Sequence, residues 1–264
     1  MQRARSWTEL LGQLFEGSWN PALQRHRSPF AFHGLTNVNH DLTTALQRLA
    51  GTHAHVVNLE LAMLRNFRKY AHDQAPGGPD SIWQWLAVAQ HHGLPTRLAD
   101  WTYSPLVALH FVTDTPSDMD RDGAVWCVNF VEAKARLPKR LRQILEEESS
   151  DTFTVDMLGD IETLREFDAL GREPFLLFLE PPALDARIVN QAALFSVMPS
   201  PSASLDAWLA AHPELCRRVV VPAGLKWEVR DMLDQSNINE RTLFPGLDGL
   251  SRSLARYYQP RTRD

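Results

Sequence analysis

The sequence predicts an α+β fold in which an N-terminal helical part packs on a mixed, mainly antiparallel sheet. Helical patterns dominate the first 115 residues, and apolar runs of strand length gather in the second half. No segment is long or polar enough to act as a linker between domains. We therefore expect a single domain over 1–264, helical over about 1–115 and sheet-rich over about 116–264.

Capping residues and apolar faces predict the early helices. In the first, Glu9, Gln13 and Glu16 interrupt any apolar run, and the apolar residues Trp7, Leu10, Leu11 and Leu14 fall on one face. This helix is therefore expected to be amphipathic and not a signal peptide. Asp41 is the expected N-cap of the second. Another early helix is expected at 55–71, with Val57, Leu61, Leu64 and Phe67 on the buried face. After a break at 75–80, a helix at 82–92 is expected with Asp80 or Ser81 as its N-cap, and one at 106–112 behind Ser104-Pro105.

The second half is expected to supply the strands. Short apolar or β-branched runs predict them at 124–130, 175–180, 186–190 and 217–222. Two late helices are expected near 225–233 and 248–258. Together these segments predict a mostly buried sheet.

Composition narrows the classes of function. The net charge is −5 and the pI about 6.1, so there is no strong nucleic-acid signal, because phosphate binding needs a basic field. The two cysteines are too few for a disulfide framework and favour a reducing compartment. No apolar run approaches the length of a membrane span. We expect a cytoplasmic protein without a membrane partner.

The phrase "QHHGLPTRLADWT" gathers polar and aromatic residues on one turn. Gly93 suits the end of a helix. His91 and His92 point about 100° apart on that helix, so they are not expected to share a site. Arg97, Asp100 and the aromatic Trp101 follow. They form either a buried Arg–Asp pair that fixes the loop or a cleft wall that recognises an anionic or hydroxyl-rich ligand.

Common catalytic signatures do not occur in the sequence. It has no HExxH or CxxC motif, so no metal site is predicted. It also has no G-x-S-x-G elbow, Walker loop or dinucleotide glycine fingerprint, which disfavours the usual hydrolase, ATPase and Rossmann classes.

The central phrase "LAVAQHHGLPTRLADWTYSPLVALHFVTDT" resembles the signature of FRG-domain proteins, a family named for a Phe-Arg-Gly near its start. The resemblance extends over roughly 30–254 through "LRNFRKYA", "GAVWCVNF", "RIVNQAALFSV" and "INERTLFPGLDGLSRSL". At the position of Phe-Arg-Gly this chain has Phe32-His33-Gly34, a departure from the family arginine.

The His-Gly pair is also similar to that of ADP-ribosyltransferases, in which an early strand carries His-Gly or Arg-Gly and a late strand begins with a glutamate. In order along the chain, Glu240 would take the place of that glutamate. Two departures weaken the likeness. His110 stands where a tyrosine is common, and Ile238 stands where many members have Gln or Glu.

This likeness implies NAD as a substrate and a set of roles. Glu240 would stabilise the oxocarbenium-like ribose, His33 would bind a ribose hydroxyl, and Gly34 would let the backbone approach the nicotinamide amide. The remaining expected site residues are Gln191 as a supporting amide, Arg97 at the pyrophosphate, Trp101 or Phe111 against the nicotinamide ring, and Asp100 in the loop that shapes the cleft.

Three hypotheses follow. In the first, the chain is an ADP-ribosyltransferase-like enzyme that transfers ADP-ribose to an unknown acceptor or hydrolyses NAD, in the role of a toxin or defence effector. Alternatively, it is a non-enzymatic sensor of a nucleotide-like ligand, or a scaffold in which Arg97, Asp100 and Trp101 only hold the fold. The enzyme hypothesis expects His33 and Glu240 to face one cleft, and the sensor hypothesis leaves Glu240 outside it.

Overall fold

The fold is built on one eight-stranded, mainly antiparallel sheet, which confirms the α+β class. The computed structural model describes residues 2–51, 55–71 and 81–261. The strand order is β1-β10-β6-β4-β5-β9-β8-β7. The strands are β1 Gln2–Arg3, β4 Phe30–Leu35, β5 Ala99–Thr102, β6 Gly123–Asn129, β7 Phe153–Thr154, β8 Leu177–Glu180, β9 Ala193–Val197 and β10 Cys216–Val221. A separate hairpin pairs β2 Trp19–Asn20 with β3 Arg25–His26.

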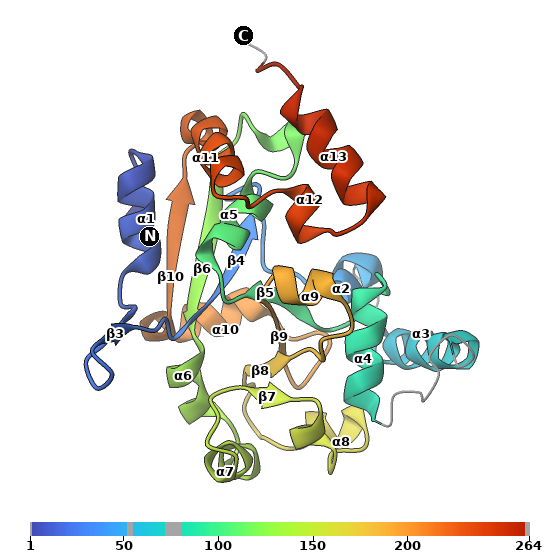
Figure 1. The fold of residues 1–264 in the computed structure, drawn as a ribbon. Helices are drawn as coiled ribbons and strands as arrows, with labels where there is room; N and C mark the ends of the chain where they lie inside the picture. Colours follow the sequence, from blue (N-terminus) through green and yellow to red (C-terminus); the bar gives the residue numbers. More distant parts are fainter. Residues whose placement is uncertain (1, 52–54, 72–80, 262–264) are drawn as a thin grey trace.

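Helices surround the sheet (Figure 1). Those before residue 115 are α1 Trp7–Phe15, α2 Ala45–Ala50, α3 Val56–Ala71, α4 Ile82–His91 and α5 Pro105–Val112. Those after it are α6 Phe130–Ala133, α7 Lys139–Glu147, α8 Leu164–Asp168, α9 Ala186–Asn190, α10 Leu205–Ala211, α11 Ala223–Gln235, α12 Glu240–Leu243 and α13 Leu247–Tyr257. Because β1, β4 and β5 come from the first 115 residues, the sheet draws on both parts of the chain.

The core divides into clusters that separate the two halves of the sheet. Apolar residues of α1, α5 and α11 pack with Phe32 of β4 and with β6 and β10. Apolar residues of α4, α7 and α8 pack with β8 and β9. Ala31 of β4 points to the opposite face of the sheet from Phe32 and packs in a third cluster with apolar residues of α10. Helices α5 and α4 therefore stand over different halves of the sheet.

The two halves meet at a weak seam between β4 and β5. Strand β4 is in register with β6 along its whole length, from Phe30 opposite Asn129 to Leu35 opposite Ala124. With β5 it shares one register pair, Phe32 opposite Thr102. Backbone groups that a complete ladder would pair are thus left to other partners at this seam.

Predicted helix ends with good caps are confirmed. Ser81 caps α4, Ser104 caps α5, and Gly93 after α4 has φ +82°. The helix expected behind Asp41 instead begins at Ala45, because Thr44 and Gln47 form a capping box. The predicted break at 75–80 lies outside the described residues.

Two predictions about local structure were wrong. Residues 186–190 form helix α9 and not a strand, because the Asp185 carboxylate accepts hydrogen bonds from the backbone N–H groups of Arg187 and Ile188. On α3 the buried face is rotated. Val57 is exposed, while Val56, Glu60 and Leu64 are buried. Among the described helices, none is long and apolar enough to cross a membrane.

Candidate active site

A cavity of about 350 Å³ opens beside the β4–β5 seam. It is bounded by β4, β5 and the start of β9, and by residues of α4, α5 and α9. Six of the residues predicted for the site line it: His33, Gly34, Asp100, Trp101, Phe111 and Gln191. The residues of β4 and β5 meet because these strands are neighbours in the sheet, while Phe111 comes from α5 and Gln191 from the turn between α9 and β9. We call this cavity the cleft.

His33 lies at the seam with a defined tautomer. Its Nδ1 is 2.6 Å from the backbone carbonyl oxygen of Asp100, which can only accept, so Nδ1 carries the proton. Burial lowers the pKa of His33, and the ring is neutral at pH 7. Its Nε2 is then an acceptor, as binding a hydroxyl group requires. The Trp101 ring contacts the imidazole edge-to-face at 5.5 Å.

Gly34 has a structural reason that the sequence analysis did not find. A Cβ added at this position would lie 2.1 Å from the backbone oxygen of Ala108 in α5. The glycine therefore lets α5 pack closely on β4, which places Phe111 in the wall of the cleft. A close approach of the helix is enough to require glycine here.

Asp100 and Trp101 are held by short polar chains. The Asp100 carboxylate accepts a hydrogen bond from Gln90 Nε2 at 3.0 Å, and Gln90 Oε1 accepts one from the Thr96 hydroxyl at 2.6 Å. Trp101 Nε1 donates to the Ser196 hydroxyl at 2.8 Å. Neither residue is held by Arg97. The buried Arg97–Asp100 pair, one of the two alternatives for this turn, is absent from the hydrogen bonds and ion pairs of the described chain.

Arg97 does not line the cleft. Its side chain is buried and forms bidentate hydrogen bonds with Glu60 of α3 and further ones with Asp168 of α8. Because its guanidinium nitrogens pair with carboxylates and the side chain is buried away from the cleft, Arg97 does not reach a phosphate bound there. The assignment of Arg97 to the pyrophosphate therefore does not fit the geometry. Its partners are 37 and 71 residues away in the sequence, and no local pattern indicated them.

Arg187 supplies the cationic group of the cleft instead. Within the described lining, it is the one arginine or lysine. It is exposed and contacts the Phe244 ring at 5.0 Å. The sequence pattern did not indicate it, because the segment was predicted to be a strand, whereas in α9 the residue lines the cavity.

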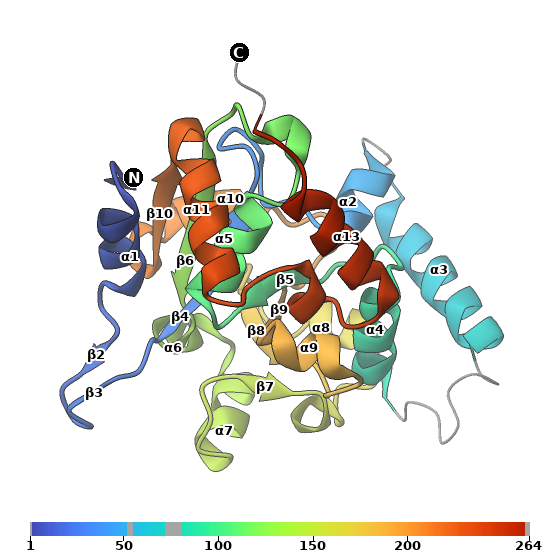
Figure 2. The ribbon, with the colours of Figure 1, turned by 45° about the horizontal axis from the view of Figure 1, so that its top comes forward.

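Gln191 lies between α9 and β9, at the start of the strand that follows. Its Nε2 donates to the backbone oxygen of Leu243, and its own backbone oxygen accepts from the Thr102 hydroxyl at 2.7 Å. The side chain thus ties the cleft to α12. Figures 1 and 2 both place α12 beside α9.

Glu240 lies outside the lining of the cleft and begins helix α12, not a late strand. Its carboxylate accepts hydrogen bonds from Arg256 at 2.6 and 2.9 Å. Burial by itself would raise the pKa of Glu240, but Arg256 and the other hydrogen bonds outweigh it and the pKa is lowered. The strand that begins at the cleft is β9, and a glutamine, Gln191, precedes it.

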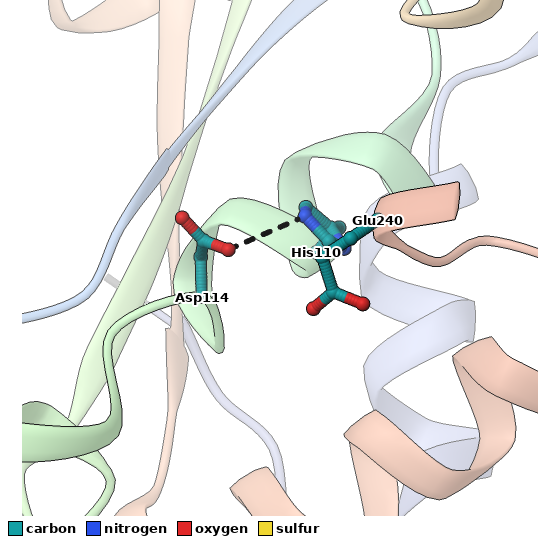
Figure 3. Close-up of side chains that lie close together, drawn as sticks. All are labelled: His110, Asp114 and Glu240. Carbon is teal, nitrogen blue, oxygen red and sulfur yellow. Dashed lines mark ion pairs between the residues drawn. The ribbon is translucent and has the colours of Figure 1, made fainter. Parts of the chain in front are cut away.

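His110, Asp114 and Glu240 lie close together (Figure 3), with potential ligand atoms within 4.8 Å of one another, and Asp114 also lines the cleft. The residues fit a metal ion poorly. Arg230 donates to His110 Nδ1 at 2.9 Å, so a neutral His110 carries its proton on Nε2, the atom that faces the carboxylates. Glu240 is already neutralised by Arg256. A metal would have to displace the proton and compete with the guanidinium groups.

The fold and the cleft define an α+β domain with an aromatic-walled cavity at a break in its sheet. A comparison with protein-family models matches residues 28–121 to the FRG domain. The chain therefore carries an FRG domain, as its central phrase predicted, and the match includes Phe32-His33-Gly34 and all of α5. No curated protein matches, and no solved structure matches.

Proposed function

We propose that the cleft binds NAD, or a nucleotide with the same ring and ribose, and that its chemistry is cleavage of the nicotinamide–ribose bond. The observation that carries the proposal is the meeting of a neutral His33, two aromatic walls and Gln191 in one cavity. The enzyme would either transfer ADP-ribose or hydrolyse NAD. Such an activity would suit a toxin or a defence effector.

The size and polarity of the cleft support a ring-and-sugar ligand. A volume of about 350 Å³ is at the small end of the range for ligand pockets. The nicotinamide and its ribose would lie inside, with the ring against Trp101 or Phe111 and a ribose hydroxyl donating to His33 Nε2. The phosphates would lie at the rim, where the guanidinium of Arg187 is free of acidic partners among the described residues.

The second candidate is a non-enzymatic sensor of the same ligand. It is favoured by the position of Glu240 outside the cleft, because the expected carboxylate is then absent from beneath the ribose, and by the neutral amide of Gln191, which lies between α9 and β9. A sensor would bind NAD without releasing nicotinamide and would signal to a partner.

Binding and turnover of NAD by the purified protein separate these alternatives. Isothermal titration calorimetry measures NAD affinity, and chromatography measures released nicotinamide. His33→Ala should weaken binding by roughly tenfold, since about 1–1.5 kcal/mol is the usual contribution of one hydrogen bond. The matched control is His40→Ala, an exposed histidine outside the cleft lining.

Three outcomes decide the proposal. Binding together with nicotinamide release, both reduced by His33→Ala, supports the enzyme. Binding without release replaces it with the sensor. If wild-type protein neither binds nor cleaves NAD, the nucleotide proposal is wrong.

A further inference from the structure

Asp114 is the acidic residue that the cleft shares with a second cavity. It follows helix α5 and lines both the cleft and a wider cavity of about 770 Å³, which Trp227, Arg256 and Arg261 also border. Its side chain is partly exposed, and no hydrogen bond to its carboxylate is found among the described residues. A ligand in the cleft therefore meets a carboxylate that is not already consumed by an arginine, unlike Glu240.

His110 points a buried N–H group at this carboxylate. The His110 side chain is fully buried, and Arg230 fixes its proton on Nε2 as described above. That nitrogen makes no hydrogen bond within the described structure and lies 3.5 Å from Asp114 Oδ1. A buried donor without a partner destabilises the folded state. This distance is short enough for a small rotation of Asp114 to complete the bond (Figure 3).

We propose that Asp114 is the general base of the cleft and that His110 is the positioning residue that orients it. The inference rests on the proposed function. A water or an alcohol hydroxyl attacks the ribose C1′, and a new C1′–O bond forms. The nicotinamide–C1′ bond breaks, and its electron pair goes to the ring nitrogen, which gives neutral nicotinamide. Asp114 takes the proton that the attacking hydroxyl loses.

The charges around Asp114 suit this role. Burial and the negative charge of Glu240 raise its pKa, and a base works best when its pKa lies nearer the working pH. Arginines on two helices oppose this increase. The charged and titratable groups that face it are His110 on α5, Arg230 on α11, Glu240 on α12, and Arg252 and Arg256 on α13.

The test of Asp114 compares two isosteric amide substitutions. Asp114→Asn should lower the rate of nicotinamide release by roughly 10²–10⁴-fold, the usual contribution of a general base, with little change in NAD affinity. Asp120→Asn is the matched control, because Asp120 is exposed and lines the wider cavity without reaching the cleft. Its turnover should equal that of the wild type.

A second variant covers the case in which Asp114→Asn folds poorly. In Asp114→Ala, added formate should restore part of the nicotinamide release, because a free carboxylate can occupy the space and accept the proton. A structural defect would not respond to formate. Turnover unchanged in Asp114→Asn, or no rescue of an inactive Asp114→Ala, overturns the assignment of the base.

The role of His110 is tested by the pH profile of turnover. The N–H of His110 favours the charged form of the Asp114 carboxylate. His110→Leu removes this donor and should raise the pKa of Asp114, so the acid limb of the profile should move to higher pH. His110→Gln retains an acceptor for Arg230 and a donor for Asp114 and should restore the limb. An unchanged midpoint in His110→Leu excludes the positioning role.

The outcomes also separate this inference from the function on which it rests. If the wild type releases nicotinamide and Asp114→Asn does so equally well, the inference alone is wrong. If the wild type binds NAD without cleaving it, the sensor stands and Asp114 is not a base. If the wild type does not bind NAD, both proposals are wrong.

Discussion

Two regions of the molecule bury an arginine beside carboxylates, and they differ in whether their buried nitrogen atoms all have hydrogen-bond partners. Around Arg97, each guanidinium nitrogen donates to Glu60 or Asp168. Around His110, the ring Nε2 and the Nε of Arg230 are buried without partners in the described structure. In the first region the charged groups pair with one another, and this pairing stabilises the fold. The second leaves buried polar atoms without partners, and one of them, His110 Nε2, lies 3.5 Å from Asp114, which lines both the cleft and the wider cavity.

The largest expected effect breaks the Arg97 region. Arg97→Met should lower the free energy of unfolding by roughly 3–5 kcal/mol, because it leaves Glu60 charged, buried and unpaired. Urea unfolding followed by circular dichroism measures this change. Arg65→Met, on the exposed face of the same helix as Glu60, is the control and should change stability by less than about 0.5 kcal/mol. Equal effects of the two substitutions would contradict a structural role for Arg97.

The pH dependence of stability tests the His110 region. Burial, with the charge of Arg230, lowers the pKa of His110 to about 3, below the 6.5 of an unfolded chain. Between these values the unfolded state binds more protons, so stability is complete above about pH 6.5 and falls as the pH decreases. One proton corresponds to about 1.4 kcal/mol per pH unit.

Urea unfolding at pH 7.0, 6.0 and 5.0 measures this slope. The variant His110→Gln should reduce it. A remainder is expected from His33, whose pKa is also lowered by burial. An equal slope in both proteins would show that His110 does not titrate as its surroundings imply.

A smaller effect on stability is expected from a change in the packing of α5, the helix that carries His110. Gly34→Ala should destabilise the protein by roughly 1–3 kcal/mol, because the new Cβ would collide with the Ala108 backbone oxygen and displace the helix that carries His110. Gly12→Ala, where a Cβ has open space, should be neutral or stabilising. Thermal unfolding measures both variants. A Gly34→Ala protein as stable as the wild type would show that α5 does not need its close approach.

The sequence predicted what depends on neighbours in the chain. Ser81 and Ser104 cap their helices because the cap is a bond over three residues. The wrong prediction of a strand at 186–190 also concerns a local interaction, because Asp185 was not recognised as the N-cap of a helix. The partners of Arg97 and the distance of Glu240 from the cleft depend on contacts between remote segments, which periodicity does not encode. His33, Gln191 and Asp100 meet through the order β4-β5-β9, and a family resemblance pointed to the first two without that order.

The seam between β4 and β5 gives His33 a second task. Strands β4 and β5 share one register pair, and beside it the imidazole N–H of His33 donates a hydrogen bond to the backbone carbonyl of Asp100. A side-chain donor thus pairs a carbonyl that a main-chain amide would pair in a complete ladder. Arginine, the residue of the family's Phe-Arg-Gly, is also an N–H donor. An arginine at this position would still supply a donor for that carbonyl, but it would offer a ligand a charged donor where His33 Nε2 offers an acceptor. The chemistry toward a ligand would then change while a cross-strand donor is retained.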